Sequence, residues 1–304
     1  MIEPILKGGY NQRLSRWSNL IKEPKMNVPW LSKQTISKRA KELIDGFQAM
    51  AGYEVKPPIP VEDIIERYLG LRLLYDDLTR VFRQEILGAV YVEARTICIN
   101  ERLFESGSEG RLVFTCGHET GHWVLHRQYA NEQPKDKTNK PSIVCNPKNA
   151  KEPIEWQADY FSSCLLMPEK DIREAFEEVC APEPLVVKNS MRDKNNAGEQ
   201  PYLEQWPFIA AAMCEAGGFS NVSKHAMIIR LQDLGLLVNK TGKKMDWNSI
   251  LVDEQSLLKD PTRRNPSLFP PGNVMQIEKY RFQFRGSDRL QRFTTKKKDR
   301  VKLV

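Results

Sequence analysis

The sequence predicts an α+β fold in which a small sheet and several helices form one domain and a helical module follows. Three segments, 71–75, 87–92 and 95–99, are rich in β-branched or aromatic residues and are typical of strands. Two later segments, 112–126 and 155–168, have a helical rhythm of apolar residues, and each carries metal-ligating side chains four residues apart. A few strands beside several helices indicate the α+β class.

The first predicted helix covers residues 33–51. Its apolar positions recur at helical spacing, and Gly52 supplies a stop signal. These positions are Ile36, Ala40, Leu43, Phe47 and Met50. We interpret this segment as a core helix. A second short helix follows the prolines of 57–60 and ends near Leu69, and the three strand-like segments come next.

The string GHETGH at 117–122 carries the strongest chemical signal. On a helix, the spacing of His118 and His122 puts both imidazoles on one face, about 40° apart. Their nitrogens can then converge on one ion at about 2.0–2.1 Å. Glu119 points elsewhere and can reach a water molecule beside the ion, as a general base must. The string therefore predicts half of a catalytic zinc site.

The third ligand is predicted to come from another segment. Leu125 and Gln128 stand where the extended motif H-E-x-x-H-x-x-G-x-x-H would have glycine and histidine, so that variant is excluded. His126 lies about 12 Å from His118 along a helix axis, which is too far for the two to share one ion.

Glu155 and Asp159 offer the missing half of the site, because they too are four residues apart on a helical stretch. Glu155 is predicted to be the third ligand. Asp159 is predicted to accept a hydrogen bond from the outer nitrogen of a ligand histidine, which fixes the ring's tautomer. An exposed helix face would explain such a pair equally well without the preceding motif. Glu152 is the alternative ligand, although Pro153 separates it from the helical stretch.

Gly117 and Gly121 flank the ligands in a helix, where each costs up to about 1 kcal/mol relative to alanine. Two such glycines suggest the close approach of another backbone, that of the Glu155 helix. Simple tolerance of glycine is the alternative.

The predicted site suits hydrolysis. Zn²⁺ held by His118, His122 and Glu155 would lower the pKa of a water molecule to about 7 and polarise a peptide carbonyl. Glu119 would take the water's proton and deliver it to the leaving amine. Two histidines and a carboxylate also suit Mn²⁺, although zinc is the expected ion. The candidates for stabilising the oxyanion, among which the sequence does not choose, are Tyr91, His126 and Tyr160.

These motifs resemble the ImmA/IrrE family of metallo-endopeptidases. The similarity rests on LVFTCGHETGHWVLH (112–126) and EWQADYFSSCLLMP (155–168), with further support from 57–73, 95–100 and 222–237. One departure is Asp159, where the family frequently has asparagine.

The resemblance implies a zincin-like metallopeptidase domain with a small sheet and two metal-binding helices. It also implies a cytosolic protease whose protein substrate is a transcriptional repressor, often of the Xre helix-turn-helix type, in phage, mobile-element or stress circuits. A different class is a non-proteolytic regulator that binds a repressor or DNA and uses zinc structurally. The intact Glu119 favours chemistry, because a structural site has no use for a base.

In many zinc endopeptidases an edge strand beside the metal receives the substrate as an added strand. We expect 95–99 or 87–92 to have that role, with an ordinary central strand as the alternative.

Composition indicates a cytoplasmic protein without a membrane partner. No run of about 18 apolar residues occurs, and the first residues lack the apolar stretch of a secretory signal. Six scattered cysteines without a C-x-x-C pattern are interpreted as reduced thiols. The net charge of +7 equals the balance of residues 280–304 alone, so residues 1–279 are neutral overall. This basic tail, with interleaved aromatic residues, is predicted either to contact nucleic acid or an acidic protein or simply to aid solubility.

Five parts are expected along the chain. They are an N-terminal extension (1–32), a zinc metallopeptidase domain (33–180), a linker (181–201), a helical module (202–279) and the basic tail (280–304). Within the first domain, the polar segment 127–153 is predicted to be a surface loop between the two metal-binding helices.

The helical module has a helix-turn-helix-like pattern. An apolar segment, 203–216, precedes Gly217 and Gly218, and Ser223 then caps a second helix. That helix carries an apolar stripe of Met227, Leu231 and Leu234. The polar candidates for DNA contact are Ser223, Lys224 and Arg230, and the head of Arg230 is expected to reach water. A packing role is favoured over DNA contact because this stretch lacks a dense basic stripe.

Overall fold

The computed structural model describes residues 26, 28–105, 109–130, 141–146, 152–180, 184–187 and 206–240. The chain divides into two compact units, Met1–Ile172 with Gly217–Arg230, and Arg173–Ala216 with Leu231–Val304. The five parts predicted from the sequence remain a prediction. The basic tail lies outside the described residues, as does most of the predicted linker.

The first helix, α2 (Lys33–Ala51), has the bounds that the sequence predicts. Ser32 caps its start, because the Ser32 hydroxyl accepts a hydrogen bond from the Thr35 N–H at 3.1 Å. Gly52 ends it with a left-handed φ of 76°. The stripe that faces the core consists of Ile36, Ala40, Leu43, Ile44 and Phe47. The last predicted stripe position, Met50, is exposed.

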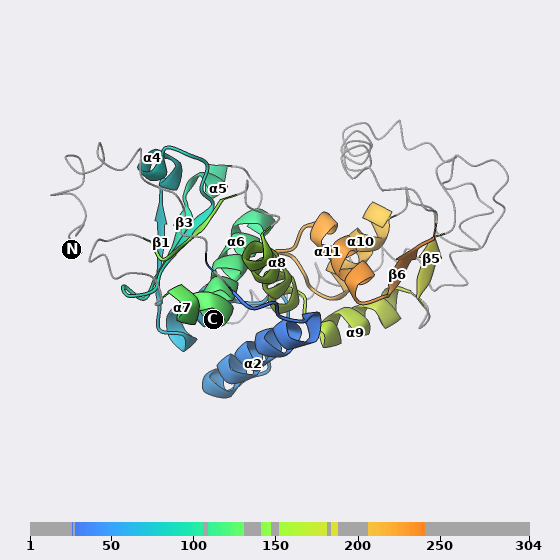
Figure 1. Ribbon diagram of the computed structural model, residues 1–304. Coiled ribbons are helices and arrows are strands. Elements are labelled where there is room, and N and C mark those ends of the chain that lie inside the picture. The colour runs from blue at the N-terminus through green and yellow to red at the C-terminus, as the bar shows by residue number, and fades with distance from the viewer. Residues whose placement is uncertain are drawn as a thin grey trace, which may run out of the picture. The chain divides into compact units, whose positions relative to one another are not determined.

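The described residues form a four-stranded sheet with the strand order β1-β3-β2-β4. Its strands β1 and β3 are labelled in Figure 1. Its strands are β1 (Arg72–Asp76), β2 (Gly88–Tyr91), β3 (Thr96–Asn100) and β4 (Ile143–Cys145). β1 pairs with β3 in parallel, and the other two pairings are antiparallel. β2 and β3 are therefore central strands, and the expectation that either is an edge was wrong. The edges within the described residues are β1 and β4.

β4 lies inside the segment 127–153 that the sequence assigned to a polar loop. The described part of that segment also contains α7 (Arg127–Ala130). The short helices α3 (Val61–Asp63), η2 (Ile64–Tyr68), α4 (Leu78–Phe82) and α5 (Arg102–Glu105) complete the connections around the sheet. Together they bring the sheet against the helices that carry the predicted ligands.

The GHETGH string spans a change of helix type. It begins in α6 (Glu109–Gly121) and ends at the first residue of the π-helical turn η3 (His122–His126). Such π-turns occur frequently at functional sites. Arg127 stabilises this turn by donating from Nη1 to the Trp123 carbonyl at 2.7 Å, and its guanidinium lies 5.5 Å from the Trp123 ring.

The helix that carries Glu155 is α8 (Pro153–Leu166), which packs against α6. A Cβ at Gly117 would lie 2.5 Å from Ser162 Oγ, and one at Gly121 would lie 3.2 Å from the Ala158 backbone. Alanine at Gly117 would require the Ser162 side chain to move, and alanine at Gly121 would require the α8 backbone to give by a few tenths of an ångström. The prediction that the glycines admit the Glu155 helix is therefore confirmed.

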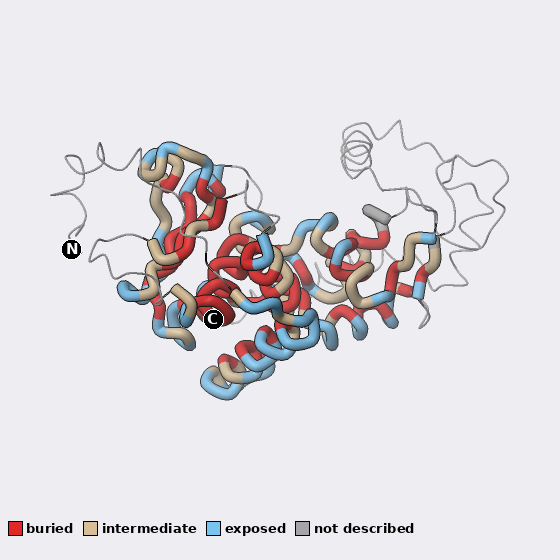
Figure 2. Tube along the Cα trace, in the orientation of Figure 1, coloured by how far each residue is buried: buried red, intermediate tan, exposed pale blue. Residues whose placement is uncertain are grey.

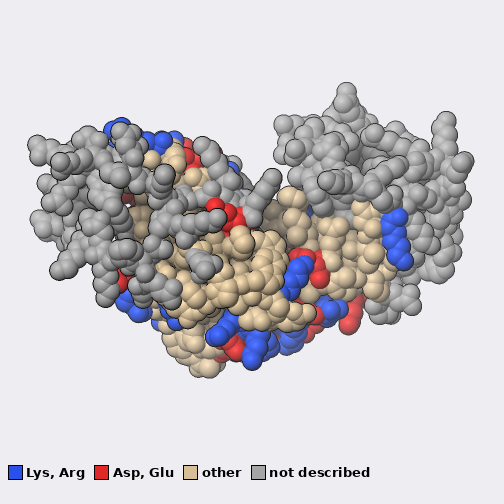
Figure 3. Space-filling model, viewed as in Figure 1, with Lys and Arg blue, Asp and Glu red and all other residues tan. Residues whose placement is uncertain are grey.

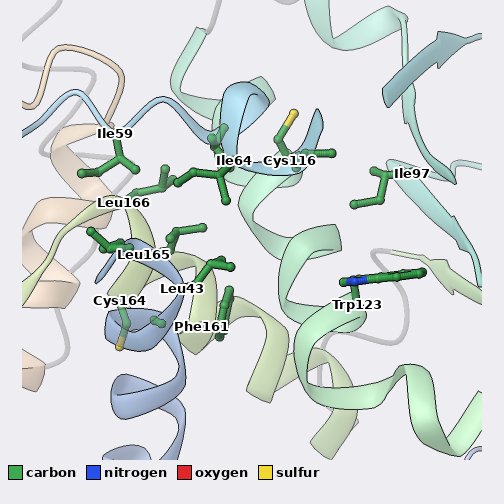
Figure 4. Packing of buried hydrophobic residues seen from close by; sticks show 14 of the residues in the cluster. Leu43, Ile59, Ile64, Ile97, Cys116, Trp123, Phe161, Cys164, Leu165 and Leu166 are labelled. Carbon is green, nitrogen blue, oxygen red and sulfur yellow. The ribbon is translucent and has the colours of Figure 1, made fainter. Parts of the chain in front are cut away.

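A single hydrophobic cluster joins α2, α6 and α8 to the sheet. Figure 4 shows Phe161, Leu165 and Leu166 of α8 near Leu43 of α2, with Ile97 of the sheet near Trp123. Figure 2 shows buried stretches along α6, α8 and the central strands. No disulfide joins the six cysteines, and five of them are buried, as expected of reduced thiols.

The remaining elements are α9 (Glu169–Val179), α10 (Trp206–Ala216), α11 (Lys224–Asp233) and a parallel pair, β5 (Leu185–Val187) with β6 (Leu237–Asn239). Helices thus occupy both predicted positions of the helical module, while its helix-turn-helix arrangement stays a prediction. The predicted cap is present, because Ser223 Oγ accepts from the Ala226 N–H at 3.1 Å.

Arg230 differs from expectation, because its head does not reach water. The side chain is 1% exposed, and its Nε donates to the Met167 carbonyl at 3.0 Å. Met167 follows the last residue of α8, so a cation sits at the carboxyl end of that helix, where it is electrostatically favourable. A buried Arg230 cannot contact DNA and instead tethers α11 to α8.

Within the described residues, no helix is both long enough and apolar enough to cross a membrane. Figure 3 shows acidic and basic side chains intermixed over α2, where Lys38 pairs with Glu42 and Lys41 with Asp45.

Candidate metal centre

Three predicted ligands meet between α6, η3 and α8. The Nε2 atoms of His118 and His122 lie 2.9 Å apart. Glu155 places one carboxylate oxygen 3.3 Å from His118 Nε2 and the other 3.4 Å from His122 Nε2. All three side chains are buried. The spacing of four residues and the junction between α6 and η3 thus turn both rings toward one carboxylate from the neighbouring helix.

The two separations that involve Glu155 fit a tetrahedral cation, and the one between the two histidines is shorter. Ligand atoms about 2.0–2.1 Å from a tetrahedral zinc are roughly 3.3–3.4 Å from one another, close to the separations between Glu155 and the two rings. Burial raises the pKa of Glu155, but hydrogen bonds with His118 and His122 outweigh it, so that its pKa lies below the ordinary value. Burial lowers the pKa of His122. Burial also opposes protonation of His118, but Cys145, Asp159 and Glu155 outweigh it and hold the pKa of His118 well above its ordinary value. An ionised carboxylate and a neutral imidazole are the forms that bind metals.

Asp159 lies where the sequence predicted it, beside the outer nitrogen of a ligand ring. Its Oδ1 is 2.8 Å from His118 Nδ1. This hydrogen bond leaves His118 Nε2 free to face Glu155 and His122. Almost half of the Asp159 side chain is exposed, at 47%, whereas the His118 side chain is only 5% exposed.

The outer nitrogen of His122 has a different partner. His122 Nδ1 lies 3.0 Å from His126 Nδ1, and His126 Nε2 lies 3.3 Å from Gln157 Oε1. Gln157 Nε2 in turn donates to the Pro29 carbonyl at 3.1 Å. His122, His126 and Gln157 are all 0% exposed. Because both nitrogens of His126 are engaged here, it is poorly placed for the oxyanion role that the sequence left open.

Glu119 is fully buried, and neither of its carboxylate oxygens has a hydrogen-bond partner among the described residues. Burial raises the pKa of Glu119 to about 8. Burying such a carboxylate lowers the stability of the fold unless a cation or a water molecule interacts with it. A divalent cation beside it would favour the ionised form. The orphaned carboxylate and the convergent ligand atoms both fit a metal at this site.

Gly88 makes room for Glu119. A Cβ built at Gly88, the first residue of β2, would lie 2.6 Å from Glu119 Cδ and 2.7 Å from Glu119 Cγ. The absence of a side chain there lets the carboxylate lie against the strand. Sequence reasoning missed this residue; a glycine at the start of a strand-like segment was the available signal.

Cys145 on β4 is the second residue that sequence reasoning missed at the site. Its sulfur lies within 4.8 Å of a ligand atom of both His118 and Glu119. The alternative ligand Glu152 is exposed and precedes α8 as its N-cap residue, so it does not join the site. Tyr160 stacks on Trp156 with ring centroids 5.5 Å apart, and Tyr91 ends β2.

Two histidines from one helix, a glutamate from a second helix and a buried glutamate beside them are the components of a metallopeptidase centre of the H-E-x-x-H type. Residues 68–179 match the family model described as the IrrE N-terminal-like domain, Peptidase M78. The matched segment contains every predicted site residue, and the match agrees with the resemblance to ImmA/IrrE proteins. A comparison with curated proteins found no match.

Proposed function

We propose that the protein is a zinc-dependent endopeptidase. The observation that carries the proposal is the Glu119 carboxylate, which is fully buried, has no hydrogen-bond partner in the described part of the chain, and lies beside the convergent ligand atoms. A structural zinc site needs only its ligands. A base held next to them has a purpose only if a proton moves there.

His118, His122 and Glu155 would hold the ion. When bound, zinc makes a neighbouring water more acidic and polarises a peptide carbonyl. Glu119 then accepts the water's proton at a carboxylate oxygen and returns it to the nitrogen of the leaving amine. Asp159 holds His118 in the tautomer that directs Nε2 inward. The dry surroundings strengthen each of these electrostatic interactions.

We propose β4 as the strand that receives the substrate, in place of 95–99 or 87–92. Within the described residues β4 pairs only with β2, so its other edge is available for main-chain hydrogen bonds. It also carries Cys145, beside His118 and Glu119. Slower amide exchange in Ile143–Cys145 on adding a substrate peptide to the Glu119→Gln variant would support this assignment, and unchanged exchange there would contradict it.

The proposed substrate is a repressor of the Xre helix-turn-helix type, and the proposed setting is the cytoplasm. Both rest on the family resemblance. Nucleic-acid contact through the basic tail 280–304 is a separate proposal, which fails if duplex DNA binding survives deletion of the tail or never occurs.

The test compares wild type with Glu119→Gln on a candidate repressor, ideally one encoded beside this gene. Wild type is expected to produce discrete repressor fragments. The variant should produce none while it retains one equivalent of zinc, because Glu119 is not a ligand. Equal relief of repression by both proteins, without fragments, would contradict the proposal and favour a non-proteolytic regulator that uses zinc structurally.

A further inference from the structure

We propose that His126 is a positioning residue for the metal centre, and that together with Gln157 it fixes the tautomer and orientation of His122. The proposal rests on the metal-binding role assigned above to His118, His122 and Glu155. It assigns to a neutral imidazole and an amide the task that Asp159 performs for His118.

The direction of each hydrogen bond that links His122, His126 and Gln157 follows from one condition. If His122 Nε2 binds a cation, the neutral ring must carry its proton on Nδ1, which therefore donates. Its partner 3.0 Å away is His126 Nδ1, which must accept. The proton of a neutral His126 then sits on Nε2 and points at Gln157 Oε1, 3.3 Å away.

The last hydrogen bond of this series, between Gln157 and Pro29, agrees with this assignment. Gln157 presents its oxygen to His126, so its amide nitrogen must find an acceptor elsewhere. It donates to the Pro29 carbonyl at 3.1 Å, and a carbonyl can only accept. The reverse direction fails at this end, because a carbonyl has no proton to donate. The donor and the acceptor of each hydrogen bond are thus fixed from the Pro29 carbonyl to His122.

The π-turn η3 holds the two rings together. His122 and His126 are its first and last residues, and their ring centroids are 5.2 Å apart. The other anchor is the segment before α2, where Trp30 stacks on Trp156 at 4.7 Å beside Pro29 and Gln157. Two separate elements therefore position the ends of the chain of hydrogen bonds.

Burial makes this arrangement matter for metal binding. His122, His126 and Gln157 are all 0% exposed, so bulk water cannot take the place of a lost acceptor. If the acceptor is removed, the Nδ1–H of His122 is left buried and unpaired, or the ring rotates or changes tautomer. Each outcome weakens the Nε2 ligand, and loss of such a partner typically costs 10–100-fold in metal affinity.

The test is a matched pair of variants, His126→Asn and His126→Leu. The two side chains are similar in size, but only asparagine keeps an acceptor, its Oδ1, near the position of Nδ1. Zinc dissociation constants are measured by competition with a chromophoric chelator, and thermal unfolding is measured on the chelator-treated proteins. We expect His126→Leu to bind zinc about 10–100-fold more weakly, while His126→Asn stays within about threefold of wild type.

If His126 served only core packing, the leucine variant would bind zinc at least as well as the asparagine variant, because leucine is better suited to a fully buried position. Under the positioning role, the metal-free leucine variant is still the more stable of the two, but it binds zinc more weakly. That reversal between stability and affinity identifies positioning. Equal zinc affinities of wild type and the leucine variant would overturn the inference and leave the metal centre intact.

The tautomer is directly observable. In the ¹⁵N NMR spectrum of the zinc-loaded protein, His126 should carry its proton on Nε2, and a proton on Nδ1 would overturn the inference. A wild-type protein that binds no zinc would overturn both the inference and the proposed function. One that binds zinc but cleaves no repressor would contradict only the proposed function.

Discussion

Glu119 and His126 are both fully buried next to the predicted zinc ligands, yet their surroundings are opposite. Neither oxygen of Glu119 has a hydrogen-bond partner among the described residues. Both nitrogens of His126 have one. Glu119 faces the sheet at Gly88, whereas His126 faces α8 at Gln157.

The difference separates two requirements of a metal-dependent catalyst. A group that moves a proton must keep a hydrogen-bonding atom without a protein partner where the reaction occurs, at a cost in folding stability. A group that positions a metal ligand must have its own donors and acceptors satisfied, because any rotation of that group lets the ligand rotate too. On the sheet side of the centre, Glu119 meets the first requirement, and on the α8 side, His126 meets the second.

The largest effect is expected on the sheet side, from Gly88→Ala. The new Cβ would meet the Glu119 side chain, 2.6 Å from Cδ, and displace the carboxylate. Misplacing a catalytic group by about 1 Å can cost roughly 100-fold in rate, so we expect a loss of about that size in repressor cleavage. Zinc affinity should hardly change, because Glu119 is not a ligand.

The matched control is Gly46→Ala in α2. There the new Cβ meets the phenol end of the Tyr68 ring, including Cζ at 2.5 Å, and this exposed ring can move aside. Normal cleavage by Gly46→Ala together with impaired cleavage by Gly88→Ala would locate the effect at Glu119. A parallel loss of zinc in Gly88→Ala would show instead that the sheet itself had shifted.

Removal of the metal is expected to lower the stability of the folded protein. A cation that binds only the folded state stabilises it by about 2.7 kcal/mol when its free concentration is 100 times the dissociation constant. A chelator should therefore lower the melting temperature, and zinc should restore it in a concentration-dependent way. In the triple variant that lacks His118, His122 and Glu155, chelator and zinc should have no effect. If they shifted its melting temperature equally, the ion would be binding elsewhere.

The sheet side was the harder half to predict from the sequence. The H-E-x-x-H spacing and the Glu155–Asp159 pair are local patterns, and a helix converts such spacing directly into position. β4 is only three residues long, within a polar stretch, so its apolar triplet gives no alternation to detect. Its strand conformation comes from pairing with β2, which is a long-range contact.

The role of His126 shows the same limit on the α8 side. Its distance along a helix excluded it as a ligand together with His118, and it is not among the convergent ligand atoms of the described residues. The sequence did not reveal that η3 is a π-turn, or that Gln157 and Pro29 would meet the ring from elements remote in sequence. Arg230 was misjudged for a related reason, since its acceptor, the Met167 carbonyl, belongs to another helix.

The two outer partners of the ligand rings should differ in how much their loss costs. Asp159 is 47% exposed, so water can replace its hydrogen bond to His118. We expect Asp159→Leu to weaken zinc binding about tenfold, the lower end of the usual range, and Asp159→Asn to weaken it less. His126→Leu should cost more than Asp159→Leu. The reverse order in a chelator competition would mean that the charge of Asp159 outweighs the burial of His126.

The smallest effect is expected where α6 and α8 touch. Ser162 Oγ donates to the Phe114 carbonyl at 2.9 Å and lies against Gly117. Ser162→Ala removes one neutral hydrogen bond, and we expect a loss of about 1 kcal/mol in unfolding free energy, measured by urea denaturation. Zinc affinity should not change, because the ligands and their outer partners keep their contacts. A tenfold drop in zinc affinity would show that this hydrogen bond, and not the glycine contacts alone, sets the distance between the two metal-binding helices.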